Sequence, residues 1–432
     1  MAVPGHTLVE KVLARASGTS ALSPGDLVTA RVDLAFAHDS SGPRRWAPML
    51  KELGVGLWDP AKVVIVSDHY VPAVDSESAA ILSLTRAFAR EHGVSNFFDM
   101  EGICHAILPE RGLVHPGMFI AGGDSHTPMA GAFGAYAAGF GATDMAAIVA
   151  TGETWLSVPG TIRVEFAGSF AVGVVAKDLM LLLCRELGMD NAFMAVEFVG
   201  TAVRAMTMSS RMVLSNMAAE LGAETGIVEP DARTLAFLAE HGADVGDPAA
   251  ALAWASDADA RYVARHSFDA STLTPQIAAP HSPANSAAVS EFVGVRIDQA
   301  YIGACVGAKL EDLQMAAAIL RGRRVAPHVR LLVAPATQRT TEAAAKDGTL
   351  AVLLESGAIL MPSGCGACAG MGAGVLANGE VCISSTNRNF KGRMGHAGAA
   401  VYLGSPYSVA AAAVMGSICD PRDLLHTKRR AA

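Results

Sequence analysis

Apolar runs and amphipathic stretches alternate along most of the chain. Thr7 followed by Glu10 is a capping-box pattern, which predicts a short helix that ends at Gly18. The β-branched run at 62–66 predicts a strand. The stretch 76–92 predicts a helix, because acidic residues open it and arginines and a glycine close it. The N-terminal part is therefore predicted to consist of repeated strand–helix units.

The same alternation continues toward the C-terminus, with one interruption. A strand is expected at 118–121, extended structure at 160–172, and helices at 176–187 and 206–221. The polar stretch 269–290, rich in Ala, Ser and Pro, has no clear period and is expected to be a linker. Further strands are expected near 293–297, 300–303, 329–333, 358–361 and 380–383. This alternation predicts layered α/β domains with largely parallel sheets.

Composition narrows the class of protein. The 432 residues suggest about two to four domains, and 51% hydrophobic with 17% charged residues is typical of a packed globule. A net charge of −8 argues against a nucleic-acid binder. No apolar run reaches the ~18–20 residues of a membrane span, and the first residues lack the apolar core of a signal peptide. A cytoplasmic location without membrane attachment is therefore expected.

Reactive side chains follow several of the expected strands at once. They are Asp68 and His69 after 63–66; Asp124, Ser125 and His126 after 119–121; Cys305 after 301–303; Cys365 and Cys368 after 360–361; and Asn387, Arg388 and Arg393 after 382–383. Any one of these groups, taken alone, is more often a helix cap or a turn. Ligands of open α/β sheets bind outside the carboxyl ends of strands. Because several such groups follow strands in one chain, the sequence favours a composite site at a domain junction.

The chain has seven cysteines, an odd number that points to packing, metal binding or catalysis in a cytosolic chain. Cys365 and Cys368 form a C-x-x-C pair, which fits a thioredoxin-like redox pair, half of a zinc site or part of an iron–sulfur cluster. The redox pair needs no third cysteine, and the zinc site needs a second pair that the sequence lacks. The cluster needs one more thiolate at a strand end, and Cys305 is placed for it. From the residues alone these alternatives stay open.

Three thiolates would leave one iron of a [4Fe–4S] cluster open, and an open iron is a Lewis acid suited to adding or removing water. Arg388 and Arg393 suit a substrate with more than one carboxylate, although a solvated basic loop is the simpler alternative. Asn216 and Glu220 lie four residues apart and would share one helix face, where an ordinary helix surface is the simpler interpretation. The remaining cysteines are expected to be packing residues: Cys104, Cys184, Cys382 and Cys419.

Taken together, these segments resemble the aconitase superfamily, and most of all the large subunit of the two-subunit isopropylmalate dehydratase and homoaconitase group. The resemblance runs from 7–18 to 405–418 and is strongest at 123–127 (GDSHT), 363–370 (SGCGACAG) and 385–393 (STNRNFKGR). Shorter matches are His38-Asp39, Asp68-His69, 105–110 and 215–220. The resemblance implies three α/β/α layered domains around an iron–sulfur cluster, without the fourth, swivelling domain. Their expected bounds are 1–160, 161–285 and 286–432.

The resemblance also implies a role for each matching residue. The ligands of a [4Fe–4S] cluster, whose fourth iron binds substrate and water, would be Cys305, Cys365 and Cys368. The hydrogen-bond and proton-relay shell around the leaving hydroxyl would consist of Asp68, His69, His105, Asp124, His126 and Glu220. The residues that orient the substrate carboxylates would be His38, Ser125, Asn216, Arg388 and Arg393. Asn387 would hydrogen-bond the cluster region.

The implied activity is reversible removal and re-addition of water on a 2-hydroxy di- or tricarboxylic acid. The main expectation is the isomerisation of 2-isopropylmalate to 3-isopropylmalate in leucine biosynthesis. In this family the base for the carbon-bound proton is a serine, beside an arginine, on the swivelling domain. Since the chain ends soon after Cys419, the resemblance implies a small partner subunit that supplies both groups, and an isolated chain that is nearly inactive.

The chain departs from the family pattern around Cys305. Val306 and Gly307 stand where Thr and Asn are usual, and Ala304 stands where Ser is common, so polar groups near the cluster are lost. This change points to altered cluster tuning or substrate contact, which leaves homocitrate or homoaconitate, or a methylated malate, as alternative substrates. Two functions of another class are a cluster-free RNA-binding protein, against which the net charge argues, and a thiol-redox protein using the C-x-x-C pair.

Overall fold

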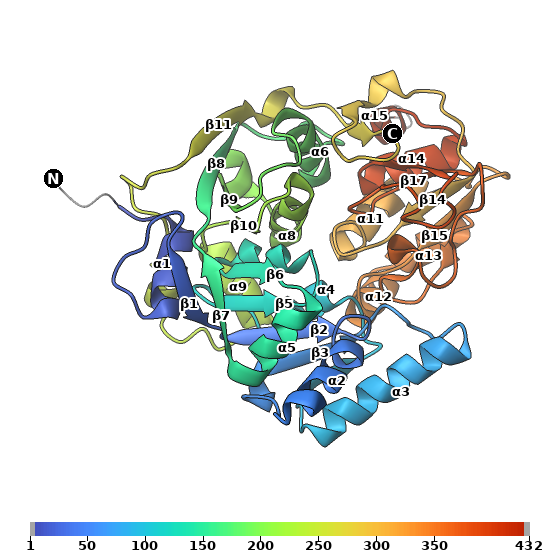
Figure 1. The fold of residues 1–432 in the computed structure, drawn as a ribbon. Helices are drawn as coiled ribbons and strands as arrows, with labels where there is room; N and C mark the ends of the chain where they lie inside the picture. The colour runs from blue at the N-terminus through green and yellow to red at the C-terminus, as the bar shows by residue number, and fades with distance from the viewer. Residues whose placement is uncertain (1–4, 427–432) are drawn as a thin grey trace.

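The computed structural model describes residues 5–426. Three largely parallel sheets follow one another along the chain, and a separate two-stranded ribbon joins the N-terminal region to the middle of the sequence. In Figure 1 the blue-to-teal unit lies at the bottom, the green unit at the upper left and the orange-to-red unit at the right. The three units meet around a common centre. This arrangement agrees with the expected mixed α/β class with parallel sheets.

The first sheet has the order β4-β3-β2-β5-β6, and all of its strands are parallel. The strands are β2 Leu34–His38, β3 Val63–Ser67, β4 Asn96–Asp99, β5 Phe119–Gly122 and β6 Tyr136–Gly139. The helices are α1 Leu8–Ser17, α2 Pro43–Leu53, α3 Ser76–Glu91, α4 Cys104–Glu110 and α5 Ala142–Thr151. Every residue of β2, β3 and β5 is buried, because helices cover both faces of a parallel sheet. The expected capping box of α1 is confirmed, as is its end at Gly18.

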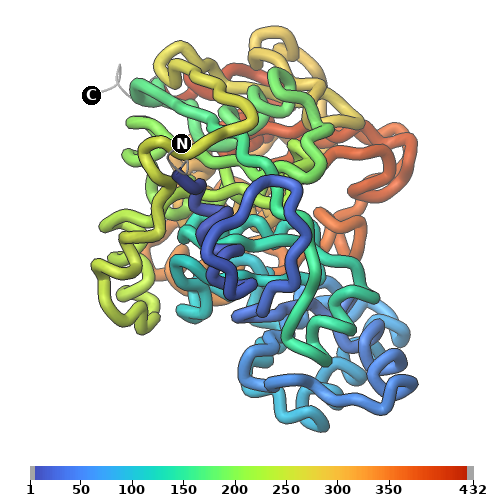
Figure 2. The backbone as a smooth tube through the Cα atoms, turned by 60° about the vertical axis from the view of Figure 1, so that its left-hand side comes forward, coloured from blue at the N-terminus to red at the C-terminus, as the bar shows by residue number. Residues whose placement is uncertain are grey.

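The second sheet is parallel, with the order β10-β9-β8-β11. Its strands are β8 Gly160–Ala167, β9 Met194–Val199, β10 Thr225–Ile227 and β11 Ala264–Asp269. Its helices are α6 Ala176–Glu186, α7 Thr201–Ala205, α8 Met208–Met217, α9 Ala232–Glu240 and α10 Pro248–Leu252. The antiparallel ribbon pairs β1 Leu27–Arg31 with β7 Glu153–Ser157. The start of the chain lies against this unit, where the Leu8 amide donates to Ser256 at 2.8 Å (Figure 2).

The third sheet has the order β13-β12-β18-β17-β14-β15-β16. Its strands are β12 Gln276–Ala278, β13 Ser286–Ala288, β14 Gln299–Ile302, β15 Arg330–Val333, β16 Ile359–Leu360, β17 Val381–Ser384 and β18 Ala400–Leu403. Its helices are α11 Leu310–Leu320, α12 Gln338–Lys346, α13 Thr349–Glu355, α14 Pro406–Met415 and α15 Pro421–His426. The chain leaves β14 toward β15 on one side and returns as β17 on the other. The carboxyl ends of β14 and β17 therefore flank a topological switch point, where α/β proteins bind ligands.

Several expected boundaries are wrong. The stretch 269–290 is no unstructured linker: it holds β12 and β13, which pair antiparallel and join the third sheet through β18. Strands of three residues are too short to show a period. Residues 293–297 form no strand and make only an isolated bridge between Arg296 and Ser417. The helix expected at 206–221 is α8 followed by a 3-10 turn at Ala218–Leu221, and the extended segment from 160 ends at Ala167.

One continuous apolar core holds parts of all three units. Its members include Phe36 and Ile120 from the first unit, Val164 from the second and Leu403 from the third. Burying such side chains contributes roughly 1.5–3 kcal/mol each, so the units are held in a fixed relation to one another. No helix in the described part of the chain is long and apolar enough to cross a membrane.

Candidate active site

The loops at the carboxyl ends of the first and third sheets contact one another. The amide of Cys365, after β16, donates to the carbonyl of Asp68, after β3, at 2.8 Å. The amide of Ile103, after β4, donates to the carbonyl of Ala336, after β15, at 2.9 Å. Strand ends that are far apart in sequence thus form one composite site, as the sequence pattern predicts.

Asp68 and His69 form a buried acid–imidazole pair after β3. Asp68 Oδ1 lies 2.7 Å from His69 Nδ1, and Asp68 Oδ2 accepts the backbone amide of Cys104 at 2.7 Å. The ring of His38 stacks on His69 with centroids 3.7 Å apart. Burial opposes protonation of His69, but Asp68 outweighs it and raises the pKa of His69 to about 9. His69 is therefore held protonated at neutral pH, with Nδ1 bound to Asp68.

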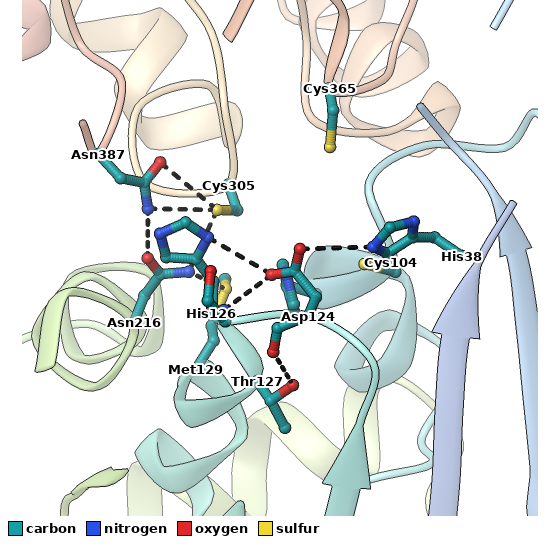
Figure 3. A network of polar contacts seen from close by, with 12 residues as sticks. His38, Cys104, Asp124, His126, Thr127, Met129, Asn216, Cys305, Cys365 and Asn387 are labelled. Atoms are coloured by element: carbon teal, nitrogen blue, oxygen red, sulfur yellow. Dashed lines mark hydrogen bonds and ion pairs between the residues drawn. The ribbon is translucent and has the colours of Figure 1, made fainter. Parts of the chain in front are cut away.

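Asp124, after β5, is the centre of a second polar group (Figure 3). Its Oδ1 lies 2.7 Å from His105 Nε2 and accepts the backbone amide of His126 at 2.7 Å. Its Oδ2 lies 3.4 Å from His38 Nε2. Burial works to raise the pKa of Asp124, but the three histidines outweigh it and hold that pKa well below its usual range. Asp124 is therefore an ionised acceptor that fixes the orientation of its histidines.

Glu220 joins the second unit to the other two. Its Oε1 lies 3.0 Å from His126 Nε2 and accepts Arg388 Nε at 2.8 Å. Arg388 Nη1 in turn donates to Ser125 Oγ at 2.9 Å. Burial opposes ionisation of Glu220, but His126 and Arg388 lower the pKa of Glu220, and Glu220 raises the pKa of His126 against its burial. The pair His126–Glu220 is thereby stabilised as an ion pair.

Cys305 follows β14 and contacts two amide side chains. Asn216 Nδ2, at the end of α8, lies 3.1 Å from Cys305 Sγ, and Asn387 Nδ2 lies 3.6 Å from the same sulfur. The two amides also hydrogen-bond each other, from Asn387 Nδ2 to Asn216 Oδ1. Burial raises the pKa of the Cys305 thiol to about 12. Cys305 thus lies among hydrogen-bond donors suited to a thiolate, while burial alone keeps it neutral.

Cys365 directly precedes the 3-10 turn Gly366–Ala369 after β16, and Cys368 lies within this turn. Cys365 Sγ lies 3.9 Å from Asp68 Oδ2, and in Figure 3 both Cys365 and Cys305 come from loops of the third unit, with the Cys305 sulfur directed at Asn387. Burial raises the pKa of both Cys365 and Cys368. Charge repulsion from Cys368 adds to burial in raising the pKa of both Cys305 and Cys365, and repulsion from Cys305 adds further to that of Cys365.

The thiols are spaced too widely for one metal ion. Sulfur ligands around a tetrahedral zinc lie about 3.8 Å apart, given Zn–S bonds of about 2.3 Å. Among the described residues, the groups whose ligand atoms all lie within 4.8 Å of one another contain only histidines and carboxylates. The three thiols together therefore lack the close spacing of ligands around one zinc ion.

Two cations near the site, buried Lys177 and half-buried Arg393, make no ion pair within 4 Å among the described residues. Lys177, in α6, is 1% exposed, and its Nζ donates to the carbonyl of Thr386 at 2.5 Å. Burial lowers the pKa of Lys177 to about 8, and it makes no ion pair within the described residues. Arg393 lies beside the Cys368 thiol, where it works to lower the pKa of Cys368 against burial. Its buried Nε has no hydrogen-bond partner among the described residues.

A cavity of about 340 Å³ opens beside these groups and is lined by Asp124, Ser125 and Arg388, among others. A smaller one of about 200 Å³ adjoins His69 and Met371. Another cavity, of about 530 Å³, lies elsewhere, between α8, α9, α11 and α12. None of the paired histidines or thiols lines it. No paired histidine or thiol lines the 340 Å³ cavity either, but the carboxylate of Asp124 and the side chains of Ser125 and Arg388 do.

The structure brings the expected site residues together. Direct hydrogen bonds or ion pairs connect His38, Asp68, His69, His105, Asp124, Ser125, His126, Asn216, Glu220, Cys305, Cys365, Asn387 and Arg388 to other members of the set. Arg393, expected with Arg388 on substrate carboxylates, lies beside Cys368. Cys104, Cys184 and Cys382 are buried and Cys419 is half-buried, as expected of packing residues.

Sequence analysis missed Lys177. The sequence indication for Lys177 is a single cation close to the apolar stretch 179–184, in a helix most of whose residues are buried. It also missed that the backbone amide of Cys104 anchors Asp68, since a backbone contact leaves no trace in residue type. Both residues lie in helices, whereas most of the expected residues follow strand ends.

Comparison with known proteins gives one consistent result. A sequence model of the aconitase family (aconitate hydratase) matches residues 10–295 and 290–416. The 3-isopropylmalate dehydratase large subunit 1 of Methanopyrus kandleri is 47% identical over 98% of this chain and 100% of its own length. The probable methanogen homoaconitase large subunit of Methanothermobacter thermautotrophicus is 44% identical over 96% of this chain and 97% of its own. The 3-isopropylmalate dehydratase large subunit of Aquifex aeolicus is 41% identical over 98% of both.

Among solved structures, the aconitase X of Thermococcus kodakaraensis in its holo-form aligns over 84% of both chains. The TM-score is 0.49 and the sequence identity is 13%. The sequence relatives are far closer, and they match this chain almost end to end.

Proposed function

The chain belongs to the aconitase family, and from that premise we propose that it is the large subunit of an iron–sulfur hydro-lyase. The main proposed reaction is the isomerisation of 2-isopropylmalate to 3-isopropylmalate by loss and re-addition of water. Relatives named 3-isopropylmalate dehydratase large subunit match nearly the whole chain, which supports this choice. The observation that carries the proposal is a wall of buried histidine–carboxylate pairs facing three thiols beside unmatched cations.

The residues fit an iron–sulfur cluster. Lys177 is buried and makes no ion pair within 4 Å, although Glu220 partly offsets its charge, and half-buried Arg393 has a buried Nε without a hydrogen-bond partner; positive charge in such a place is costly unless an anion lies nearby. A thiolate-ligated cluster is anionic and would provide that charge. Asn216 and Asn387 direct amide protons at one sulfur, and such hydrogen bonds tune a cluster. We assign the cluster ligands to Cys305, Cys365 and Cys368.

When bound, a [4Fe–4S] cluster with three cysteine ligands supplies an open iron, a Lewis acid for the hydroxyl and a carboxylate of the substrate. The chain itself must deliver a proton to the leaving hydroxide. His69 is suited to this, because its Nδ1 is held by Asp68 and its Nε2 has no partner among the described residues. The protonated imidazole can donate from Nε2, and general acid catalysis of this kind contributes about 10²–10⁴-fold.

The second histidine group keeps the geometry fixed while the proton moves. Asp124 binds both His105 and the backbone of His126, and Glu220 binds the far side of the His126 ring. Both acids are held ionised against burial, so both imidazoles keep one defined orientation. We propose that these residues, with Asp68 and His69, are the proton-relay shell of the reaction.

Substrate carboxylates would be bound at the mouth of the polar cavity. Arg388 and Ser125 line it and already hydrogen-bond each other there, so a carboxylate could take donors from both. His38 contacts Asp124 and Asn216 contacts Cys305, and we propose that both orient the reacting end of the substrate. Arg393, beside Cys368, would bind a carboxylate on the cluster side.

A small partner subunit is part of the proposal. The relatives are named large subunits, which supports a second chain. We propose that this chain covers the cavity and supplies a serine base and an arginine, so that the isolated large subunit is nearly inactive. The expected domains are 1–160, 161–285 and 286–432. We propose to end the second domain at 275 and begin the third at 276, because β12 pairs with the third sheet.

The test is turnover by the reconstituted pair. The chain is expressed with the small subunit from the same source, loaded with iron and sulfide under anaerobic conditions, and given 2-isopropylmalate, homocitrate, methylated malates and malate in turn. Formation of the unsaturated diacid from 2-isopropylmalate alone is the expected result. Preference for homocitrate would replace the substrate but keep the reaction class, and the 44% identical homoaconitase relative makes it the second candidate. Dithiol oxidation by metal-free chain, without hydration activity, would contradict the proposal.

A further inference from the structure

The loop that presents Cys305 contains a strained residue. Ala304 has φ 68°, which lies in the left-handed region that residues other than Gly, Asn and Asp rarely adopt. It lies directly between the end of β14 and Cys305 and is 2% exposed. Such conformations persist only where the surroundings over-determine them, and they cluster at functional sites. The question is which contact enforces this one.

Ser385, just after β17, provides that contact. Its Oγ accepts the backbone amide of Gly303 at 3.0 Å and lies 3.2 Å from the carbonyl oxygens of both Gly303 and Gly307. The hydroxyl has one proton, which the two carbonyls share. Ser385 is fully buried, and its own amide donates to the Tyr301 carbonyl at 3.0 Å. One hydroxyl thus binds both ends of the turn 303–307.

Gly307 is what allows Ser385 to approach so closely. A Cβ atom at position 307 would lie 2.3 Å from Ser385 Oγ and 2.4 Å from Ser385 Cβ, closer than real side chains come. Position 307 and Ser385 are therefore matched: the missing side chain leaves the space that the hydroxyl uses.

We propose that Ser385 is a positioning residue, which holds Ala304 in the left-handed conformation and so sets the direction of the Cys305 thiol. The loop after β17 then fixes Cys305 twice, through the Ser385 hydroxyl on the backbone and the Asn387 amide on the sulfur. The role of Cys305 as a cluster ligand rests on the proposed function. The contacts of the Ser385 hydroxyl with Gly303 and Gly307, which we call the clamp, do not depend on that function.

The test measures how fast a chelator removes iron from the reconstituted full-length chain, followed by the visible absorption of the cluster. Ser385→Ala is expected to release iron about tenfold faster, the scale typical of residues that orient metal ligands. Adding Ala304→Gly to that variant is expected to restore release to within about threefold of the wild type, because glycine adopts the left-handed conformation without penalty. A merely structural loss at Ser385 would not be repaired by a neighbouring glycine.

Ser356→Ala is the matched control. Ser356 is 2% exposed, and its hydroxyl donates to the Leu353 carbonyl at 2.6 Å, outside the site. This variant is expected to lower the melting temperature without changing iron release. Wild-type release rates in Ser385→Ala, or no recovery in the double variant, would overturn the inference and leave the proposed function intact.

A second arm separates the two proposals completely. If the wild-type chain takes up no cluster, the proposed function fails, and the clamp is then measured in cluster-free protein by alkylation of Cys305. This thiol is 5% exposed in the native conformation. Faster labelling of Cys305 in Ser385→Ala, reversed by Ala304→Gly, is the expected result. Equal labelling in all variants would overturn the clamp on its own.

Discussion

The two walls of the site differ in how completely their charges are balanced. On the wall from the first unit, each buried acid faces an imidazole: Asp68 binds His69, and Asp124 binds His105. On the second wall, three neutral thiols of the third unit lie near Arg393 of the same unit and Lys177 of the second unit, and neither cation makes an ion pair within 4 Å among the described residues. The first wall is complete as it stands, and the second lacks negative charge.

This difference separates two kinds of function. Removing one partner of a buried ion pair leaves an uncompensated charge, so substitutions on the first wall should destabilise it. With its ion pairs intact, the first wall needs no cofactor to be stable. On the second wall, the desolvation of cations without an ion pair costs free energy unless an anionic group is bound there. Changes on the first wall should therefore alter the rate of reaction, and changes on the second should alter whether the cofactor stays bound.

The largest effect is expected where the second wall loses a ligand. Cys365→Ser should abolish both cluster content and turnover in the reconstituted pair, because a serine hydroxyl is a poor substitute for a thiolate. Iron and sulfide analysis, with the activity assay, gives the measurement. Cys419→Ser is the control, since Cys419 is half-buried and outside the site. An active Cys365→Ser enzyme would mean that the thiols are not the cofactor site.

A change on the first wall should lower the rate and spare the cluster. Asp124→Asn keeps the shape of the side chain but removes the charge that orients His105 and His126. We expect kcat to fall by about 10²–10⁴-fold with unchanged iron content. Asp144→Asn, at an exposed position in the first turn of α5, should have no effect. Loss of iron from Asp124→Asn would show that the two walls are not separable.

Lys177→Met should have opposite effects with and without the cofactor. Removing a buried ammonium of depressed pKa should stabilise the cluster-free chain by about 1–2 kcal/mol. The same change should destabilise the loaded chain, since it removes countercharge. Because the pKa of Lys177 falls from 10.5 to about 8 on folding, wild-type apo stability should rise as pH increases from about 8 to 10.5. Melting curves of both forms, with and without cluster, measure this; an equal shift in both forms would contradict it.

The smallest effect is expected away from both walls. Burial raises the pKa of Glu110 to about 7, so the unfolded chain loses its proton at lower pH than the folded one. The contribution of Glu110 to stability is thus lost as pH rises from about 4.5 to 7. Glu110→Gln should flatten this dependence by on the order of 1 kcal/mol and leave kcat unchanged. An altered kcat would show that this region communicates with the site.

Much of this arrangement was predictable, for a simple geometric reason. Parallel strands end at one edge of a sheet, so Asp124 and Cys305 could be placed at a site from the apolar runs that precede them. The hairpin of β12 and β13 could not, because strands of three residues carry no period. Lys177 was missed because a helix surface gives no warning of which neighbour will cover it. The place of Arg393 beside Cys368 depends on loop conformation, which residue order does not encode simply.

The central claim is that three thiols and their unmatched cations form the binding site of an iron–sulfur cluster with one open iron. The most direct measurement is anaerobic reconstitution of the purified chain, followed by EPR of the reduced cluster before and after addition of hydroxy diacids. The account predicts a cluster signal in the wild type that is absent in Cys305→Ser and that shifts when 2-isopropylmalate is added with the small subunit. A chain that takes up no cluster, or holds one equally well without Cys305, would contradict it.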